Sequence, residues 1–578
     1  MTIGSKRKIL GTVLLPFAVV AAGSAIAGSK TYTLDADFSL GTLSGVNHDA
    51  PNNNQLQLST VGTTFPVMWV ANAGEDTVSK FDTKNNKELA RYHTWFGPKK
   101  AGGAYSGPAP SRTSVDIDGN AYVLNRHFDG RKPLLIKILA EGGIDRNGNG
   151  VIDTSTDTSG NGKIEDAEMF RIQDLNGNGK IDDNEITDER VAWAVEVGVA
   201  SGLGRSLCIG GDGNLWVGMY NTRQYFKVSG VDGSQIAGPI AVPSTPYGCL
   251  IDRDGNLWSA DLGSTLMKIE NANSNTGPYN VSAKSNCSNY GIGLGNGKVY
   301  LGNGNRQYDI AANGPSCTAI PGASVGSLGI VVDGGGNIII GTGMVQKIRP
   351  DGTVAWTAPL QAGGGSSIGI QVDGDNNVWQ IGMGSNRVHK YNGVTGAAMG
   401  VYDVGREPYT YSDATGLVSR NVTTGTGTWT VTQDGGGAGV KWGTISWNAA
   451  VPTGASISVE ARTAETEAGL SGAAYSAVTS GTNFSKTGRY IQVRARLNEN
   501  TSNQSPVLYD LTVSSLVTTC DVDKDGDIDM LDINQIRAGI GQTPVSGDPR
   551  DATGDGKITI NDVRACTLKC TRASCATN

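Results

Sequence analysis

The sequence predicts a mainly β protein, in which a seven-bladed β-propeller is followed by a β-sandwich and a small α-helical module. Three observations predict this order. A unit of about 40 residues recurs through the first part of the chain, each time with an Asn-containing turn before an apolar strand. The following stretch is rich in Thr, Ser, Gly and Val in alternating runs. The C-terminal segment is rich in Asp and Cys and contains two short helical patterns.

The chain begins with the pattern of a secretory signal peptide. Lys6-Arg7-Lys8 form a basic region, Ile9 to Ala22 form an apolar run, and Ala25-Ile26-Ala27 form a small-residue cleavage motif. We expect residues 1–27 to be removed and the mature protein to be secreted or held at the cell surface. The alternative is a membrane anchor, but the apolar run is shorter than the roughly 20 residues of a span. No membrane span is expected after cleavage.

The cysteines and the charge distribution fit an exported protein. There are 8 cysteines, an even number, and none lies in a CxxC motif, so disulfides are expected with their pairing left open. The net charge is −7, and the acidic residues gather in 145–189 and 521–562. Two local acidic regions indicate cation sites and argue against nucleic acid as a partner, because nucleic acid requires basic patches.

The repeated unit is a hairpin whose turn reads Asp-x-Asp-Gly-Asn and whose second strand is aromatic. Copies of this unit lie at residues 114–123, 208–217 and 250–258, and weaker copies lie at 296–300, 336–339 and 376–379. Glycine suits the turn because it adopts positive φ without steric cost. Third and fourth strands, such as 345–348 and 354–356, complete four strands per unit, which is the content of one propeller blade. With a degenerate first copy ending at Val70, seven blades are predicted over residues 62–405.

These repeats resemble the NHL and virginiamycin B lyase-like β-propellers over roughly 340 residues. The resemblance implies the propeller fold and is poorly specific for function. Those lyases use a histidine with glutamates near the central channel, whereas glutamates are absent from the strand ends of this chain, such as Val70-Ala71-Asn72. His127, beside Arg126 just after a strand, is the single weak catalytic candidate. The alternative for His127 is an ordinary polar residue of a loop.

One blade carries an insert at residues 141–189 that contains three calcium-loop motifs. A twelve-residue EF-hand loop offers oxygen ligands at positions 1, 3, 5, 9 and 12, a backbone carbonyl at position 7 and a glycine at position 6. The predicted ligands are Asp145, Asn147, Asn149, Val151 and Asp153 in the first loop, Asp157, Ser159, Asn161, Lys163, Glu165 and Glu168 in the second, and Asp174, Asn176, Asn178, Lys180, Asp182 and Glu185 in the third.

The first of these loops is incomplete, because Thr156 occupies position 12. We expect it to bind calcium weakly or to borrow a ligand. The alternative for the whole insert is a polar surface loop rich in Asn and Gly. Since the insert has few apolar residues, a packed core is not expected to order it, and metal binding is expected to supply the missing free energy.

Residues 406–517 predict a β-sandwich. Alternating runs such as Thr428-Trp429-Thr430-Val431 and Tyr490-Ile491-Gln492-Val493-Arg494 are typical of half-buried strands. The N-terminal segment, residues 28–61, carries a similar pattern of short strands. We therefore expect this segment to pack beside the sandwich.

Residues 518–578 contain two more calcium-loop motifs about 30 residues apart, each ending in Asp and followed by a short helix. Over residues 519–570 they resemble a type I dockerin. The resemblance implies one ion held by Asp521, Asp523, Asp525, Asp527, Asp529 and Asp532, and another held by Asp551, Thr553, Asp555, Lys557, Thr559 and Asp562. It also implies docking to a cohesin-like partner. The Cys-rich tail from Cys566 onward departs from this family, so a self-contained calcium-stapled cap is the alternative.

Taken together, the sequence predicts a secreted protein that binds about four to five Ca²⁺ ions. Its propeller and sandwich are expected to act as a binding or assembly platform. The partner is expected to be a cohesin-like protein, a cell-surface protein or a glycan. The alternative is an extracellular propeller enzyme, a lyase or a lactonase-like hydrolase, with accessory modules. A ring of acids or histidines at one mouth of the channel would favour the enzyme.

Overall fold

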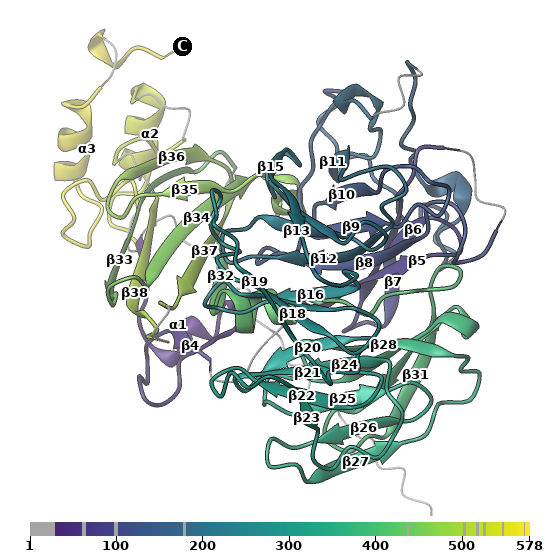
Figure 1. Ribbon diagram of the computed structural model, residues 1–578. Helices are drawn as coiled ribbons and strands as arrows, with labels where there is room; N and C mark the ends of the chain where they lie inside the picture. The colour runs from purple at the N-terminus through teal and green to yellow at the C-terminus, as the bar shows by residue number, and fades with distance from the viewer. Residues whose placement is uncertain are drawn as a thin grey trace, which may run out of the picture.

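The computed structural model describes residues 29–59, 65–97, 102–176, 181–435, 438–500, 504–515, 519–523, 528–545, 548–570 and 573–577. The predicted signal peptide and the predicted ligands Asn178, Lys180, Asp525 and Asp527 lie outside these residues. The chain is mainly β, as predicted (Figure 1). Among the helices of the described residues, none is long and apolar enough to span a membrane.

Residues 67–403 form a β-propeller, built in the described residues from one three-stranded and six four-stranded antiparallel sheets. The first sheet has β5 (Val67–Asn72), β6 (Thr77–Asp82) and β7 (Lys87–His93), and the second has β8 (Pro110–Val115), β9 (Ala121–Asn125), β10 (Leu134–Ile138) and β11 (Val191–Glu196). The third has β12 (Gly204–Ile209), β13 (Leu215–Met219), β14 (Gln224–Val228) and β15 (Gln235–Ala241), and the fourth has β16 (Gly248–Ile251), β17 (Leu257–Ala260), β18 (Leu266–Ile269) and β19 (Val281–Lys284).

The last three sheets follow the same order along the chain. The fifth has β20 (Ile292–Gly295), β21 (Lys298–Leu301), β22 (Arg306–Asp309) and β23 (Thr318–Ala319). The sixth has β24 (Gly329–Val332), β25 (Ile338–Gly341), β26 (Val345–Ile348) and β27 (Val354–Ala358). The seventh has β28 (Ser367–Val372), β29 (Val378–Gly382), β30 (Arg387–Tyr391) and β31 (Ala398–Asp403).

The repeated turn motif explains how the first two strands of a sheet are joined. In the fourth sheet, Gly255 has a φ of 75°, and the Asp252 carboxylate accepts from Asn256 N at 2.8 Å. The same carboxylate accepts from the indole nitrogen of Trp258 at 2.8 Å. Asp373 and Trp379 repeat this bond at 2.8 Å in the seventh sheet. The motif therefore caps its own turn and fixes the aromatic residue of the next strand.

The ring is closed by residues 407–415, which we call the closing segment. This segment runs antiparallel to β5, where Tyr409 N donates to Ala71 O at 2.8 Å and Trp69 N donates to Ala414 O at 2.9 Å. On one side, the side chain of Gln371 on β28 donates to Ser412 O at 2.8 Å. On the other side, Thr113 N on β8 donates to the Ser412 hydroxyl at 2.9 Å. The closing segment thus lies beside β5 as the innermost chain of the first sheet. The predicted C-terminal boundary of the propeller, residue 405, falls just before this segment.

Two further antiparallel sheets share one hydrophobic core, and we call them the two-sheet unit. One contains β1 (Ser29–Tyr32), β38 (Val507–Ser515), β33 (Lys441–Ala450) and β36 (Asn483–Thr487). The other contains β2 (Thr42–Ser44), β32 (Thr426–Asp434), β37 (Tyr490–Asn498), β34 (Ser456–Ala464) and β35 (Ser476–Val478). The N-terminal strands β1 and β2 extend one edge of each sheet, while β3 (Val46–Asn47) pairs with β4 (Gln57–Leu58). Phe38 of α1 (Asp35–Phe38) packs edge-on against Trp429 at 5.3 Å.

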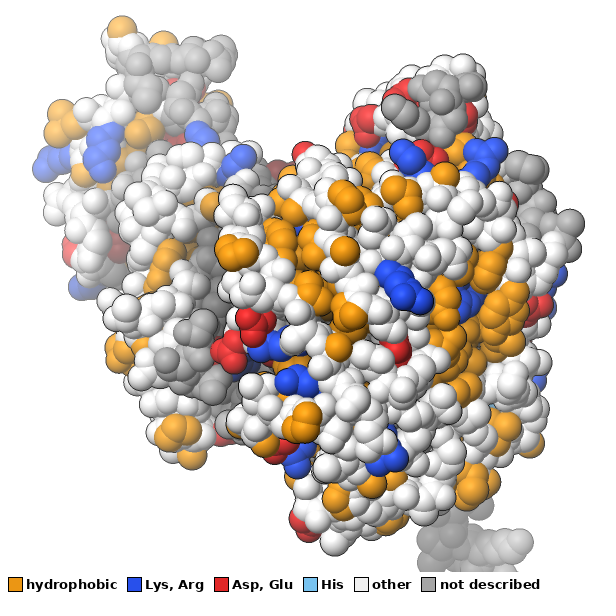
Figure 2. Space-filling view, viewed as in Figure 1, with side chains coloured by type: hydrophobic (Ala, Val, Ile, Leu, Met, Phe, Trp, Pro, Cys, Tyr) orange, Lys and Arg blue, Asp and Glu red, His pale blue; other side chains and the backbone are white. Residues whose placement is uncertain are grey.

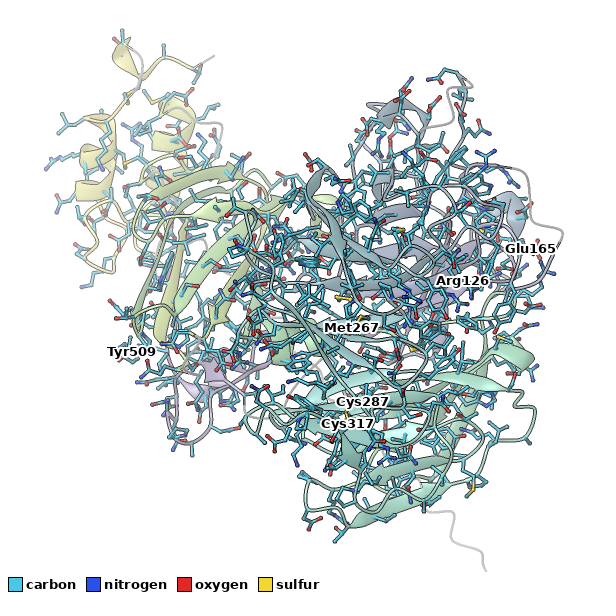
Figure 3. The ribbon with its side chains drawn as sticks, in the orientation of Figure 1. Arg126, Glu165, Met267, Cys287, Cys317 and Tyr509 are labelled. Carbon is cyan, nitrogen blue, oxygen red and sulfur yellow. A yellow bond between two sulfur atoms is a disulfide. The ribbon has the colours of Figure 1, made fainter. Side chains whose placement is uncertain are left out.

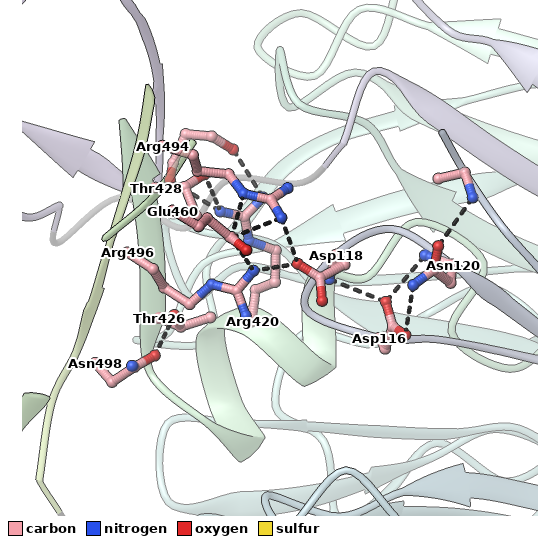
Figure 4. A network of polar contacts seen from close by, with 12 residues as sticks. Asp116, Asp118, Asn120, Arg420, Thr426, Thr428, Glu460, Arg494, Arg496 and Asn498 are labelled. Atoms are coloured by element: carbon pink, nitrogen blue, oxygen red, sulfur yellow. Dashed lines mark hydrogen bonds and ion pairs between the residues drawn. The ribbon is translucent and has the colours of Figure 1, made fainter. Parts of the chain in front are cut away.

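The two-sheet unit meets the propeller at the face that carries the Asp-Gly-Asn turns (Figure 4). Asp118, in the turn between β8 and β9, lies 3.5 Å from Arg494 on β37 and also pairs with Arg496 of the same strand. Glu460 on β34 lies 2.7 Å from Arg494. The buried Arg420, which follows the closing segment, donates to Ser44 O at 2.9 Å. Polar contacts therefore hold the two units in one orientation.

The C-terminal module contains α2 (Met530–Ala538) and α3 (Ile560–Thr567), which pack through Ile533, Ile536, Ile558 and Val563. Disulfides are present, as expected, and they join the pairs Cys208–Cys249, Cys287–Cys317, Cys520–Cys566 and Cys570–Cys575 (Figure 3). The Cys520–Cys566 bridge ties the start of this module to its second helix.

Ring closure is tested at Gly369 on β28. A Cβ added to Gly369 would lie 1.7 Å from Thr410 O of the closing segment. We expect Gly369→Ala to displace that segment and to lower the free energy of unfolding of the propeller by about 1–3 kcal/mol, the usual cost of overpacking. Denaturant unfolding followed by tryptophan fluorescence measures the change.

Gly343→Ala is the matched control, because a Cβ at Gly343 meets no described atom within 4 Å. Equal unfolding midpoints for the two variants would contradict the role given to the closing segment.

Candidate functional site

The insert at 141–189 leaves the propeller after β10 and returns at β11, and Glu165, in its second loop, lies at the right-hand edge of the molecule (Figure 3). Acidic side chains also lie around the projection at the upper right of the space-filling view (Figure 2). The root of the insert is anchored by three buried isoleucines, Ile164, Ile172 and Ile186. Ile172 and Ile186 are bridged to each other and join the core beneath β7 and β10. The insert therefore has a small apolar footing, while its loops lie at the surface.

The acid at position 1 has the same role in three of the predicted loops. One oxygen of Asp145 accepts from Gly148 N at 2.7 Å, and the other accepts from Gly150 N at 2.9 Å. Asp157 makes the equivalent bonds to Gly160 N and Gly162 N, both at 2.7 Å. Asp551 accepts from Asp555 N at 3.2 Å and Gly556 N at 2.9 Å. The glycine at position 6 has positive φ in each case, 79° at Gly150, 82° at Gly162 and 78° at Gly556.

The acid at position 12 bridges the two ends of its loop. Glu168 accepts from Ser159 N at 2.8 Å and from Glu165 N at 3.0 Å. Glu185 accepts in the same way from Leu175 N at 2.7 Å and Asp182 N at 2.9 Å.

The C-terminal loops repeat this bridge with aspartates. Asp532 accepts from Val522 N at 2.5 Å and from Asp529 N at 3.0 Å. Asp562 accepts from Thr553 N at 2.9 Å and from Thr559 N at 2.7 Å. In all four loops one carboxylate thus links position 2 or 3 to position 9, which gathers the ligand positions around a common centre.

The first loop obtains its bridging acid from outside the motif. Glu189 accepts from Arg146 N at 2.8 Å with one oxygen and from Asp153 N at 2.9 Å with the other. These donors are positions 2 and 9 of the first loop. Glu189 therefore makes the bridge that Thr156, at position 12, cannot make because it has no carboxylate. Sequence reasoning missed this residue because it lies far beyond position 12, and spacing carries no signal for it.

The first C-terminal loop has donors that fit a hard cation. Asp521, Asp523 and Asp532 bring carboxylate oxygens within 4.8 Å of one another. Asp529 is buried, and its Oδ2 has no hydrogen-bond partner among the described residues. An unpaired buried carboxylate oxygen is costly, and oxygen donors of this kind are those that Ca²⁺ prefers. These four aspartates could therefore hold a calcium ion.

His127, the weak catalytic candidate, lies in the packing between the first two sheets. Its side chain is fully buried, Nδ1 lies 3.0 Å from the Asp129 carboxylate, and the ring packs edge-on against Trp95 at 4.7 Å. Burial lowers the pKa of His127, although Asp129 opposes the shift. Burial therefore favours the neutral form of His127 over the imidazolium.

The mouth of the channel opposite the Asp-Gly-Asn turns is lined by arginines and tyrosines. The hydroxyl of Tyr409 lies 2.5 Å from that of Tyr290 and 3.3 Å from that of Tyr247. The guanidinium of Arg126 lies 4.5 Å from the Tyr409 ring, and that of Arg205 lies 4.9 Å from the Tyr247 ring. These described residues form a ring of arginines and tyrosines, and not the ring of acids or histidines that would favour an enzyme. The sequence did not indicate Tyr409 as a residue of the channel mouth, because residues 406–517 were assigned to the predicted β-sandwich.

Similarity to known proteins is confined to solved structures, since no protein-family model and no curated protein matches the chain. A catalytically inactive virginiamycin B lyase from Staphylococcus aureus with quinupristin is 13% identical, over 51% of this chain and 84% of that chain, with a TM-score of 0.36. A protein from Lactobacillus plantarum is 10% identical, over 60% of this chain and 97% of that chain, with a TM-score of 0.40.

Hydrazine synthase from Kuenenia stuttgartiensis is 13% identical, over 53% of this chain and 90% of that chain, with a TM-score of 0.36. Because each TM-score is below 0.5, these similarities carry no information about activity.

The disulfides of the C-terminal module differ in the length of chain that they close. Cys520 and Cys566 are 46 residues apart, whereas Cys570 and Cys575 are 5 apart. By loop-closure entropy the first contributes about 4 kcal/mol and the second about 2 kcal/mol. We expect replacement of Cys520 and Cys566 by Ser to increase hydrogen exchange in α2 and α3 of the full chain.

The control for this experiment is the replacement of Cys570 and Cys575 by Ser, which should change exchange in α2 less. Equal exchange in the two double variants would contradict the structural role of the longer bridge.

Proposed function

We propose that this chain is a secreted, calcium-binding protein of several domains that serves as an extracellular binding or assembly platform. The observation that carries this proposal is the common hydrogen-bond frame of five acidic loops, three in the insert and two at the C-terminus. The consecutive sheets support seven blades, with the closing segment completing the first. The two-sheet unit supports the predicted β-sandwich, and the two loop–helix units support a dockerin-like module.

Calcium would order the loops by replacing hydrogen bonds with metal–oxygen bonds. Ca²⁺ takes six to eight oxygen ligands and accepts a bidentate carboxylate at position 12. Glu168, Glu185, Asp532 and Asp562 hold that position in four loops, and Glu189 takes it in the first. With Glu189 included, we expect five ions. The incomplete first loop thus becomes a full site that borrows its last ligand.

The terminal module supports docking to a protein. Leu531 of α2 and Ile560 of α3 are 50% and 51% exposed, and Leu568, just after α3, is 89% exposed. Large apolar side chains exposed on a small module are candidates for an interaction surface. Among the partners considered, a cohesin-like or other cell-surface protein therefore fits better than a glycan. Secretion is supported by the predicted signal peptide and by the four disulfides.

The calcium proposal predicts the stoichiometry and its dependence on Glu189. The intact protein should bind about five ions, and chelation by EDTA should lower its melting temperature, because ligands that bind the folded state stabilise it. Glu189→Gln should bind one ion fewer, since an amide cannot act as a bidentate anionic ligand. Calorimetric titration after EDTA treatment measures both.

Glu196→Gln is the matched control, because Glu196 lies on β11 outside the loops and should leave the count unchanged. A protein that binds no calcium at millimolar concentration would refute the proposal. If Glu189→Gln bound as many calcium ions as the intact protein, only the role of Glu189 as a ligand of the first loop would be refuted.

The docking proposal predicts capture that requires both calcium and the exposed apolar residues. The intact protein should retain a partner from the surface proteins or secretome of the source organism in calcium, and lose it in EDTA. The double variant with Leu531→Ser and Ile560→Ser should retain less of that partner at equal calcium content. Val394→Ser, at an apolar position on the propeller that is 85% exposed, is the control. Equal recovery with and without calcium would argue against a docking face built by calcium.

A further inference from the structure

Three guanidinium groups are buried at the channel mouth. Arg112 lies on β8, Arg126 follows β9, and Arg205 lies on β12, with 0%, 0% and 8% of their surfaces exposed. The hydrogen bonds that they make within the described residues end on backbone carbonyls, such as Arg112 Nε to Arg205 O at 2.7 Å and Arg126 Nε to Ala109 O at 2.9 Å. Both terminal nitrogens of Arg112, Nη1 of Arg126 and Nε of Arg205 have no hydrogen-bond partner in the part of the chain that the structure describes.

Aromatic rings surround these charges without neutralising them. The guanidinium of Arg112 lies 3.5 Å from the centre of the Tyr411 ring, and Arg205 lies 5.3 Å from that of Tyr220. Ring faces attract cations, but they carry no net charge. The arginines cannot lose their protons, and three like charges repel one another in a medium of low dielectric. A buried cluster of this kind needs a negative partner.

Hydroxyl groups converge on the same place. The hydroxyls of Tyr247 and Tyr290 both lie within hydrogen-bond distance of the Tyr409 hydroxyl. O–H and N–H donors that meet around one point match the several lone pairs of an oxyanion. Neither a cation nor an apolar ligand would satisfy this set of donors.

The cluster is open to solvent at its rim. Phe128, Tyr220 and Tyr290 are only partly buried, and Tyr105 is 56% exposed. An open depression of about 690 Å³ adjoins the rim at Tyr105 and is also lined by Arg406 and Glu407. The Tyr105 ring lies 5.4 Å from the guanidinium of Arg126, so a group carried on a larger molecule can approach the cluster from this depression.

We propose that the channel mouth binds a ligand through an oxyanion group, held by Arg126 and Arg205 together with the hydroxyls of Tyr247 and Tyr290. The proposal rests on the propeller being a binding platform and adds the class of ligand that it takes. The group is a carboxylate of an acidic sugar or an inorganic sulfate or phosphate, since the same donors serve each of them. The site shares no residue with the calcium loops, so its failure and theirs can be told apart.

An internal anion would compete with such a ligand. Burial alone would raise the pKa of Tyr409, but hydrogen bonds from Tyr105, Tyr247 and Tyr290, together with Arg126, lower it. As the pH rises, an ionised Tyr409 would supply the negative charge and repel the ligand. Binding is therefore expected to weaken as the pH rises, in step with the absorbance of tyrosinate.

The test uses the full chain with calcium present and four probes at equal ionic strength: glucuronate, sulfate, phosphate and, as reference, chloride. We expect glucuronate, or else sulfate and phosphate, to bind saturably at one site per chain and to raise the melting temperature above that in chloride. Arg205→Gln should weaken this binding by about ten-fold or more, because it removes a charge-assisted hydrogen bond. Binding of glucuronate alone identifies an acidic sugar as the ligand, and binding of sulfate or phosphate alone identifies an inorganic anion.

Arg131→Gln is the control, because Arg131 is exposed on a loop of the same face. Tyr290→Phe keeps the ring and removes one hydroxyl, so it should weaken binding several-fold even if Arg205→Gln fails to fold. The proposal is overturned if no probe binds saturably in the millimolar range. It is also overturned if Arg205→Gln folds and Tyr290→Phe and Arg205→Gln both bind as tightly as the parent chain.

Discussion

The rest of the structure depends on one contact, the pairing of the closing segment with β5. The first sheet starts with a strand that matches the second strand of the other repeats, so its inner edge would otherwise be left unpaired. Residues 407–415 fill that edge and at the same time contact β8 and β28. A propeller leaves only short, protected strand edges once its ring of sheets is closed. The chain therefore secures the first and last blades with a segment that precedes the two-sheet unit.

The closing segment also determines which side chains line the mouth of the channel. The closing segment brings Tyr409 and Tyr411 to the mouth, where they pack against Arg126 and Arg112. It then continues past the buried Arg420 into β32. The same stretch thus completes the ring, lines the mouth and fixes where the two-sheet unit attaches. A change that loosened it would act on all three at once.

Most of the features that the sequence predicted are local, and most of those that it missed join distant residues. The Asp-Gly-Asn turns and the acidic loops place their partners within about a dozen residues, so spacing alone reveals them. Glu189 completes a loop that starts at Asp145, and no motif spans that separation. The closing segment has no Asp-Gly-Asn turn of its own, so the repeat pattern places it in the next domain. The arginines of the mouth meet only because neighbouring blades bring Arg112, Arg126 and Arg205 together.

The insert lies at the junction between the propeller and the two-sheet unit, so ordering its loops would affect how the two are held together. Its root contacts the two-sheet unit directly, since Glu141 lies 3.0 Å from Arg462 on β34 and Gly142 N donates to Ser471 O at 2.9 Å. The loop that borrows Glu189 spans from just after this contact to the start of β11. An ion that ties Asp145 to Glu189 would join the two ends of the insert and hold its root against β34. Calcium in the insert would then stiffen the junction between the domains, whereas the channel mouth, on the opposite face, is left free to bind.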